Sequence, residues 1–142
     1  MTRVMQSVVV DANPGQVFRF LMDANNMQKF LPISRVEVLE STGSQFRAKH
    51  DFRCAGKTVE LTSVGESVEG GRKVRYRSVE GAPINSSFSM ADMRGQCKIT
   101  YMLDYQPMGG PLAKVLDKWT TQKDMEKLCA DILQKLQAAF AK

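Results

Sequence analysis

The stretch that decides the fold is residues 46–54, Phe46-Arg47-Ala48-Lys49-His50-Asp51-Phe52-Arg53-Cys54, in which charged residues alternate with mostly apolar ones. Successive side chains of a β-strand point to opposite faces. Burying four charges would be costly, so the charged set must face water. The stretch therefore predicts an antiparallel strand with one wet face. Its inner face carries Phe46, Ala48, Phe52, Cys54 and His50, the only histidine of the chain.

The same period of two continues on both sides of this strand, from Ile33 to Pro107. Short breakers rich in Gly, Ser and Pro divide the region at intervals that suit hairpins rather than crossover connections. Six strands are expected, at residues 33–41, 45–54, 57–68, 72–80, 84–93 and 97–106.

Before these strands, residues 2–11 are mostly β-branched or apolar and predict a further strand. Asn13 and Pro14 then suit the N-cap and first position of a helix over residues 14–23. A second short helical segment, 25–31, is expected to end at Pro32, which cannot continue it.

After the last strand the apolar residues recur at helical spacing and predict one helix over residues 112–140. Such a helix would be roughly 43 Å long at 1.5 Å per residue. Its apolar stripe needs a surface of similar length, and only the inner face of a strongly twisted sheet offers one. We expect the sheet to curl around the helix.

Three local motifs carry a resemblance to a known superfamily. They are VVVDANPGQVFRFL (8–21), with its D-A-x-P-x-x-V-F core, DANNMQKFLP (23–32) and Gly110-Pro111-Leu112. In this order the chain resembles the START-related, polyketide-cyclase-like and coenzyme-Q-binding-like (SRPBCC) proteins. The resemblance implies an α+β helix-grip fold: a curved antiparallel sheet of about seven strands, with two short helices after the first strand and the long C-terminal helix across the concave face. It also implies a cavity for lipids, quinones, steroids or aromatic polyketides.

Composition agrees with an ordinary globular protein. The 142 residues are 43% hydrophobic and 25% charged, with a net charge of +5, so we expect a single domain over residues 1–142. Neither a membrane span nor a secretory signal is evident, and a cytoplasmic location is expected. Three scattered cysteines and one histidine predict no disulfide framework and no metal site. No cofactor is expected.

Strand phase selects the residues that would line a ligand cavity of roughly 300–1,000 Å³ beside the terminal helix. Such a lining is mostly apolar, with a few hydroxyls and one imidazole. The candidate ligand-binding residues are Phe46, His50, Phe52, Leu61, Tyr76, Phe88, Met90, Tyr101, Leu103 and Tyr105 from the strands and Leu116 and Trp119 from the helix.

His50 is the sharpest of these candidates. An apolar cavity would depress the pKa of His50 and keep it neutral, unless a carboxylate reaches it from another strand. It could then donate a hydrogen bond to a ligand carbonyl, act as a general base, or be a buried histidine with no ligand role. The tyrosines could stack on a planar ligand, or their hydroxyls could reach water at the cavity mouth.

The basic residues of the outer face leave two alternatives open. They could bind an anion, or they could form a solvated face paired with Glu60 and Glu66 on the strand between them. A nucleic-acid platform would need aromatic residues beside its basic groups, and none accompany these. DNA binding is therefore not expected. The basic set is Arg47, Lys49, Arg53, Arg72, Lys73, Arg75 and Arg77.

The sequence favours a protein that binds or transfers a hydrophobic small molecule, such as a lipid, a quinone or an aromatic polyketide. A polyketide cyclase or dehydratase is the enzymatic alternative, since an inward histidine and tyrosines could serve acid–base chemistry. An interaction module that docks its basic face on RNA, the ribosome or another protein is the third.

Overall fold

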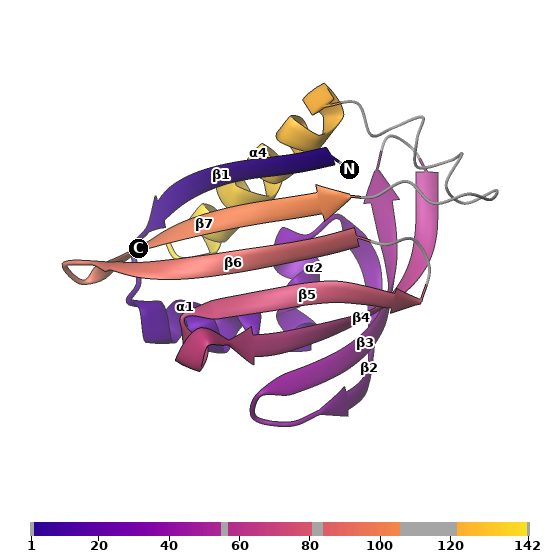
Figure 1. The fold of residues 1–142 in the computed structure, drawn as a ribbon, viewed down its shortest axis with the longest axis horizontal. Helices are drawn as coiled ribbons and strands as arrows, with labels where there is room; N and C mark the ends of the chain where they lie inside the picture. Colours follow the sequence, from indigo (N-terminus) through magenta and orange to yellow (C-terminus); the bar gives the residue numbers. More distant parts are fainter. Residues whose placement is uncertain (1, 55–56, 81–83, 106–121, 142) are drawn as a thin grey trace.

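The computed structural model describes residues 2–54, 57–80, 84–105 and 122–141. Seven antiparallel strands form one sheet in the order β1-β7-β6-β5-β4-β3-β2 (Figure 1). In chain order the elements are β1 (Thr2–Val10), α1 (Pro14–Leu21), the 3₁₀ turn η1 (Ala24–Asn26), α2 (Met27–Phe30), β2 (Ile33–Ser41), β3 (Gln45–Cys54), β4 (Lys57–Val68), the 3₁₀ turn η2 (Glu69–Gly71), β5 (Lys73–Glu80), β6 (Ile84–Met93), β7 (Gln96–Tyr105) and α4 (Gln122–Ala139).

The strands expected from the period of two are confirmed, with ends that differ by at most one residue. Helix α1 begins as predicted: the Asn13 side chain accepts from the Gln16 backbone N–H, and the Gln16 side chain accepts from that of Asn13. The second helical segment divides into η1 and α2. Residues 112–121 of the expected terminal helix lie outside the described residues.

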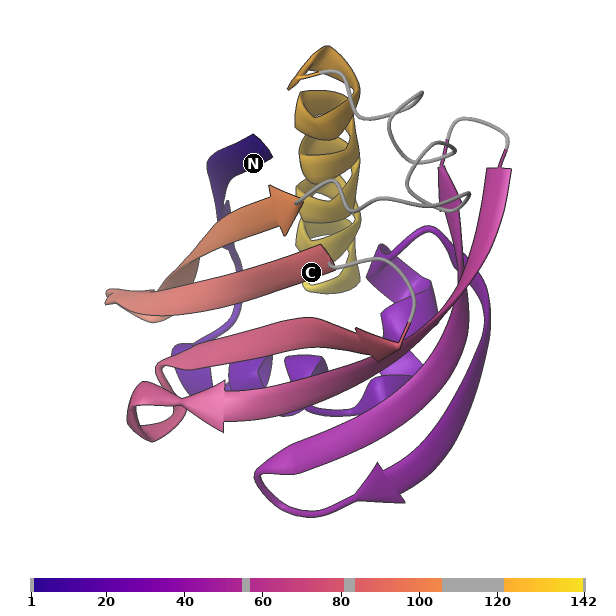
Figure 2. The ribbon, with the colours of Figure 1, turned by 45° about the vertical axis from the view of Figure 1, so that its right-hand side comes forward.

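The described helices α1, α2 and α4 lie on the same side of the sheet, which bends around them (Figure 2). This is the expected helix-grip arrangement. Helix α4 packs against β1 and α2. Its buried residues face the sheet, and they are Met125, Cys129, Ile132, Leu133 and Leu136.

Five aromatic rings fill the middle of the concave face: Phe30 from α2, Phe46 from β3, Tyr76 from β5, Phe88 from β6 and Tyr101 from β7. Tyr76 lies 5.7 Å from Phe46 and 5.6 Å from Phe88, measured between ring centroids. Phe88 in turn lies 5.8 Å from Phe30 and 4.6 Å from Tyr101. These separations suit edge-to-face and offset contacts. We call these five residues the aromatic cluster.

Tyr76 also joins the sheet to the first helix. Its hydroxyl donates a hydrogen bond to the backbone carbonyl of Leu21, the last residue of α1. The final carbonyls of a helix have no partner within the helix. The phenol therefore satisfies a buried acceptor that would otherwise be unpaired, and it fixes where α1 ends above the sheet.

The two edges of the sheet are different. Along β1, α4 supplies side-chain contacts: the Gln137 amide donates to the Val9 carbonyl at 3.1 Å, and the Gln6 amide of β1 donates to the Glu126 carbonyl at 3.0 Å. The opposite edge strand, β2, departs from regular pairing twice, between Ile33 and Val36 and between Val38 and Glu40.

Gly65 of β4 makes room for the aromatic cluster. It is paired with Phe46 on one side and Tyr76 on the other. A Cβ atom at this position would lie 2.3 Å from two atoms of the Phe46 ring. Because that ring is buried and packed on Tyr76, it has little freedom to move away.

Gly65→Ala is therefore expected to lower the free energy of unfolding by about 1–3 kcal/mol, the usual cost of overpacking a core. Urea denaturation of the two proteins would measure this difference. The matched control is Gly43→Ala in the β2–β3 turn, where nothing lies within 4 Å of the added carbon. Equal stability of the two variants would show that the Phe46 ring does not occupy this space.

Candidate functional site

A cavity lies between α2 and the inner face of strands β3 to β7. Its volume is about 40 Å³. The lining is mostly apolar, with an imidazole, two serine hydroxyls and two phenols among its side chains. The residues are Met27, Leu31, His50, Leu61, Ser63, Tyr76, Ile84, Ser86, Tyr101 and Leu103.

This cavity is smaller than about 300 Å³ because the rings of the aromatic cluster occupy space that strand phase alone leaves open. Residues 112–121 of the expected terminal helix lie outside the described residues, so the larger cavity expected beside that helix stays a prediction. What remains has room for one polar group of a ligand or a few water molecules.

Five of the predicted site residues come together around the cavity: His50, Leu61, Tyr76, Tyr101 and Leu103. Three others, Phe46, Phe88 and Met90, are buried in the core as expected but do not line this cavity. The side chains of Phe52 and Tyr105 lie outside the described part of the structure, as do Leu116 and Trp119.

His50 is buried, with 4% of its surface exposed, and its Nε2 lies 2.9 Å from the Ser63 hydroxyl. Its other ring nitrogen, Nδ1, is buried and has no hydrogen-bond partner among the described residues. Buried polar atoms without a partner are rare in folded proteins, because the lost hydrogen bond to water is not replaced. The inward orientation predicted for His50 is confirmed.

Burial lowers the pKa of His50 to about 4 from its ordinary value of 6.5, and the neighbouring Asp51 carboxylate, which acts in the opposite direction, does not offset it. The Asp51 side chain belongs to the charged outer set of β3, so it does not share the cavity. The imidazole is therefore neutral at physiological pH, as the sequence predicted.

The two tyrosines of the cavity are buried rather than wet at its mouth. Burial raises the pKa of both Tyr76 and Tyr101. The Tyr76 hydroxyl donates its proton to the Leu21 carbonyl. Neither phenol is poised to lose a proton near neutral pH.

Sequence reasoning missed Ser63, which the structure places beside His50. The signal is present in the sequence: strand phase places Leu61 on the inner face, and Ser63 follows two residues later on the same face of β4. Ser86 was also missed, although it precedes the predicted Phe88 by two residues on the same face of β6.

Met27, Leu31 and Ile84 were missed as well. They lie at the ends of a helix and a strand, where the alternation of strand side chains does not show which way a side chain points.

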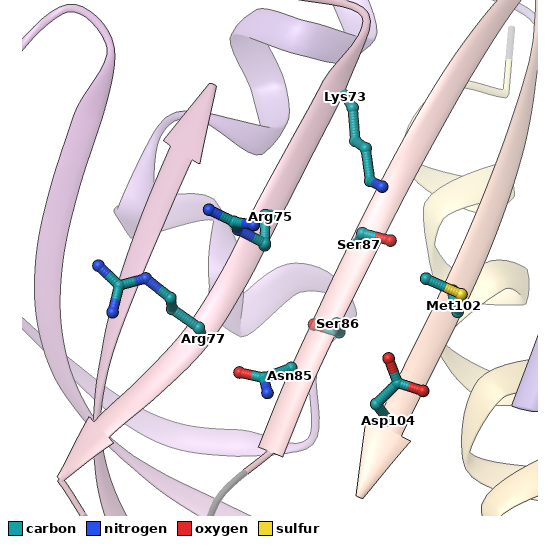
Figure 3. Close-up of a pocket in the computed structure, with 8 residues that line it drawn as sticks. All are labelled: Lys73, Arg75, Arg77, Asn85, Ser86, Ser87, Met102 and Asp104. Carbon is teal, nitrogen blue, oxygen red and sulfur yellow. The ribbon is translucent and has the colours of Figure 1, made fainter. Parts of the chain in front are cut away.

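The convex face carries a second hollow, of about 370 Å³, with β6 as its floor. Figure 3 shows its lining from three strands: Lys73, Arg75 and Arg77 from β5, Asn85, Ser86 and Ser87 from β6, and Met102 and Asp104 from β7. Both arginines and the aspartate of this lining are already in ion pairs. Glu66 binds both Arg75, at 2.6 Å, and Arg77, at 3.2 Å, and Asp104 binds Arg3 at 2.6 Å.

The predicted pairing with Glu60 is also present, since Glu60 contacts Lys49 at 3.3 Å. Arg35, which is not part of the predicted basic set, lies 3.7 Å from Glu60. The hydrogen bond from Arg75 is the main reason that the pKa of Glu66 is lowered. The pairing with Glu60 and Glu66 thus accounts for part of the basic set. The side chain of Arg53 lies outside the described residues.

Neither a metal-ligand cluster nor a membrane-spanning helix is found in the described ranges. Within residues 2–54, 57–80, 84–105 and 122–141, no three His, Cys, Asp or Glu side chains cluster as metal ligands would. In the same ranges no helix is both long enough and apolar enough to cross a membrane. Cys97 and Cys129 are buried free thiols, and burial raises the pKa of each.

Solved structures share this fold at low sequence identity. A STAR-related lipid transfer protein from Xanthomonas axonopodis matches with a TM-score of 0.82 and 15% identity, over 99% of this chain and 86% of that one. A protein from Thermus thermophilus matches with a TM-score of 0.75 and 19% identity, over 99% and 100%. The Zhui aromatase/cyclase from a Streptomyces species matches with a TM-score of 0.68 and 19% identity, over 99% of this chain and 96% of that one. At such identities the likeness shows the fold alone.

No curated protein matches the sequence. A family match, in contrast, covers nearly the whole chain, from residue 1 to residue 141, and that family is described as polyketide cyclase / dehydrase and lipid transport. The helix-grip fold and the signatures at residues 8–21 and 23–32 agree with this match. The chain belongs to the polyketide cyclase / dehydrase and lipid transport family of the SRPBCC superfamily.

Proposed function

We propose that this protein binds an uncharged, largely apolar small molecule in the cavity between the sheet and its helices. The observation that carries the proposal is His50, which lines an otherwise apolar cavity with one ring nitrogen buried and unpartnered among the described residues. A ligand that pairs with this nitrogen would recover the lost hydrogen bond, while its apolar body would contact Leu61, Leu103 and the tyrosine rings.

The volume of the cavity sets a condition on such binding. A lipid or a polycyclic aromatic molecule is much larger than 40 Å³. The described cavity therefore accommodates the polar end of the ligand. To take up the rest, either the lining separates, with α2 moving from the sheet, or the ligand extends past the described residues.

Binding is favoured over cyclase or dehydratase activity by the proton chemistry of the cavity. A general acid or base works best with a pKa near the working pH. The pKa of His50 is lowered to about 4, and the pKa values of Tyr76 and Tyr101 are raised. Among the described residues of the cavity, these groups hold fixed protonation states at neutral pH and suit recognition rather than proton transfer.

The same cavity supports a small-molecule function better than docking through the basic face. Lys49, Arg75 and Arg77 of the basic set already pair with Glu60 or Glu66, so a polyanion would have to displace these carboxylates. No comparable competition from the described residues exists at His50 Nδ1.

Neutral, buried His50 makes stability depend on pH. Its pKa is lower in the folded chain, about 4, than in the unfolded chain, about 6.5, so the unfolded chain binds more protons between these values. Stability is therefore highest above pH 6.5 and falls as the pH is lowered towards 4, because the buried ring does not take up the proton that the unfolded chain binds. The expected loss is on the order of 3 kcal/mol.

The matched comparison is His50→Phe, which keeps a ring of similar size and cannot titrate. Urea denaturation at several pH values should show the unfolding free energy of the original protein falling more steeply below pH 6.5 than that of the variant. Carboxylates affect both proteins equally. Parallel curves would mean that His50 is charged or solvated in the folded state.

Ligand binding is expected to depend on the inner face and not on the convex face. Leu61→Phe puts a larger side chain against the cavity. The control is Met102→Phe, which also replaces an aliphatic side chain with a phenylalanine, but in the convex hollow. 1-Indanone, a neutral bicyclic molecule with one carbonyl group, should bind the original protein and Met102→Phe alike. It should bind Leu61→Phe roughly tenfold more weakly, from steric conflict.

Titration of isotope-labelled protein by NMR would measure these affinities and locate the affected amides. Shifts should concentrate at cavity residues such as Leu61, Leu103 and Tyr101. Shifts confined to the convex hollow, or a loss of binding in Met102→Phe alone, would contradict the assignment of the site.

A further inference from the structure

His50 and Ser63 are neighbours by strand register. His50 of β3 is paired with Leu61 of β4, and Ser63 is paired with Ala48, so His50 and Ser63 are diagonal neighbours on the inner face. Both residues are buried. The 2.9 Å separation of Nε2 and Oγ is a normal hydrogen-bond length.

This hydrogen bond can be written in two directions, because a neutral imidazole carries one proton on either nitrogen. In the first arrangement the Ser63 hydroxyl donates to Nε2, and the ring proton sits on Nδ1. In the second, Nε2–H donates to the Ser63 oxygen, and Nδ1 is a bare acceptor.

The two arrangements leave different numbers of groups unpaired. With Ser63 as donor, the Nδ1–H group alone lacks a partner among the described residues. With Nε2–H as donor, both the Nδ1 lone pair and the Ser63 proton lack one, because His50 is the only hydrogen-bond partner of the Ser63 hydroxyl within the described residues. Each buried unpaired group is costly, so the first arrangement is the more stable.

We infer that Ser63 holds His50 in the Nδ1–H tautomer, and that the cavity thereby selects ligands with a hydrogen-bond acceptor, such as a ketone, quinone or ester carbonyl. This inference rests on the proposed function and narrows its ligand class. Ser63 acts as a positioning residue: its hydrogen bond to Nε2 keeps the ring proton on Nδ1, the nitrogen that would face the ligand.

The Tyr76 hydroxyl does not compete for this role. It already donates its proton to the Leu21 carbonyl. A ligand hydroxyl that must donate would face an Nδ1–H group that also donates. Alcohols and phenols oriented in that way are therefore disfavoured relative to carbonyls.

The tautomer can be tested without a ligand. Nitrogen-15 NMR of the imidazole distinguishes a protonated ring nitrogen from a bare one, and His50 is the only histidine in the chain. The expected spectrum has the proton on Nδ1. Ser63→Ala should shift the population towards Nε2–H, whereas Ser86→Ala, a matched change in the same cavity, should leave it unchanged. A proton on Nε2 in the original protein would overturn the inference.

The selectivity can be tested with 1-indanone and indane, which share one bicyclic frame and differ by a carbonyl. The original protein should bind 1-indanone about tenfold more tightly than indane, and His50→Phe should remove the difference. If His50→Phe does not fold, Ser63→Ala serves instead, with a reduced preference expected. Equal affinities in the original protein would overturn the selectivity and leave the proposed function standing. Failure of both molecules to bind would overturn the proposed function itself.

Discussion

The packing of Tyr76 at the centre of the concave face determines much of the rest of this structure. Its ring contacts Phe46, Phe88 and Phe30, which brings together β3, β5, β6 and α2. Its hydroxyl fixes the end of α1 through the Leu21 carbonyl. The position of the helices above the sheet, the need for glycine at position 65 and the small volume of the cavity all follow from the space these rings require.

The polar pair of His50 and Ser63 lies against this apolar core. Burying an imidazole with one nitrogen unpaired costs free energy, and a phenylalanine in the same place would not carry that cost. The structure therefore keeps at this position a group that weakens the fold, which is typical of a site that serves binding. The same burial that destabilises the charged imidazole also fixes its protonation state, so that the ring can recognise a partner without exchanging protons with it.

Much of the fold could be predicted from local patterns. The alternation in residues 46–54 indicated the strand and the inward side of His50, and Asn13 with Pro14 located the start of α1. The cavity could not be predicted in the same way. Strand phase shows which face a residue occupies, but not how far its ring reaches, and the overlap of Phe30, Phe88 and Tyr101 depends on packing between elements far apart in the chain. Strand alternation could, however, have placed Ser63 near His50, since Ser63 lies on the inner face of β4 together with Leu61.

The two edges of the sheet have a consequence for how copies of this chain meet. An exposed strand edge is a template on which another chain can add a strand, and aggregation often begins there. On β1, the Gln137 amide already occupies the Val9 carbonyl, and α4 lies alongside. On β2, the two irregularities near Val36 and Glu40 interrupt the regular spacing that an incoming strand would have to match. The sheet is thus protected at both ends against growth from one molecule to the next.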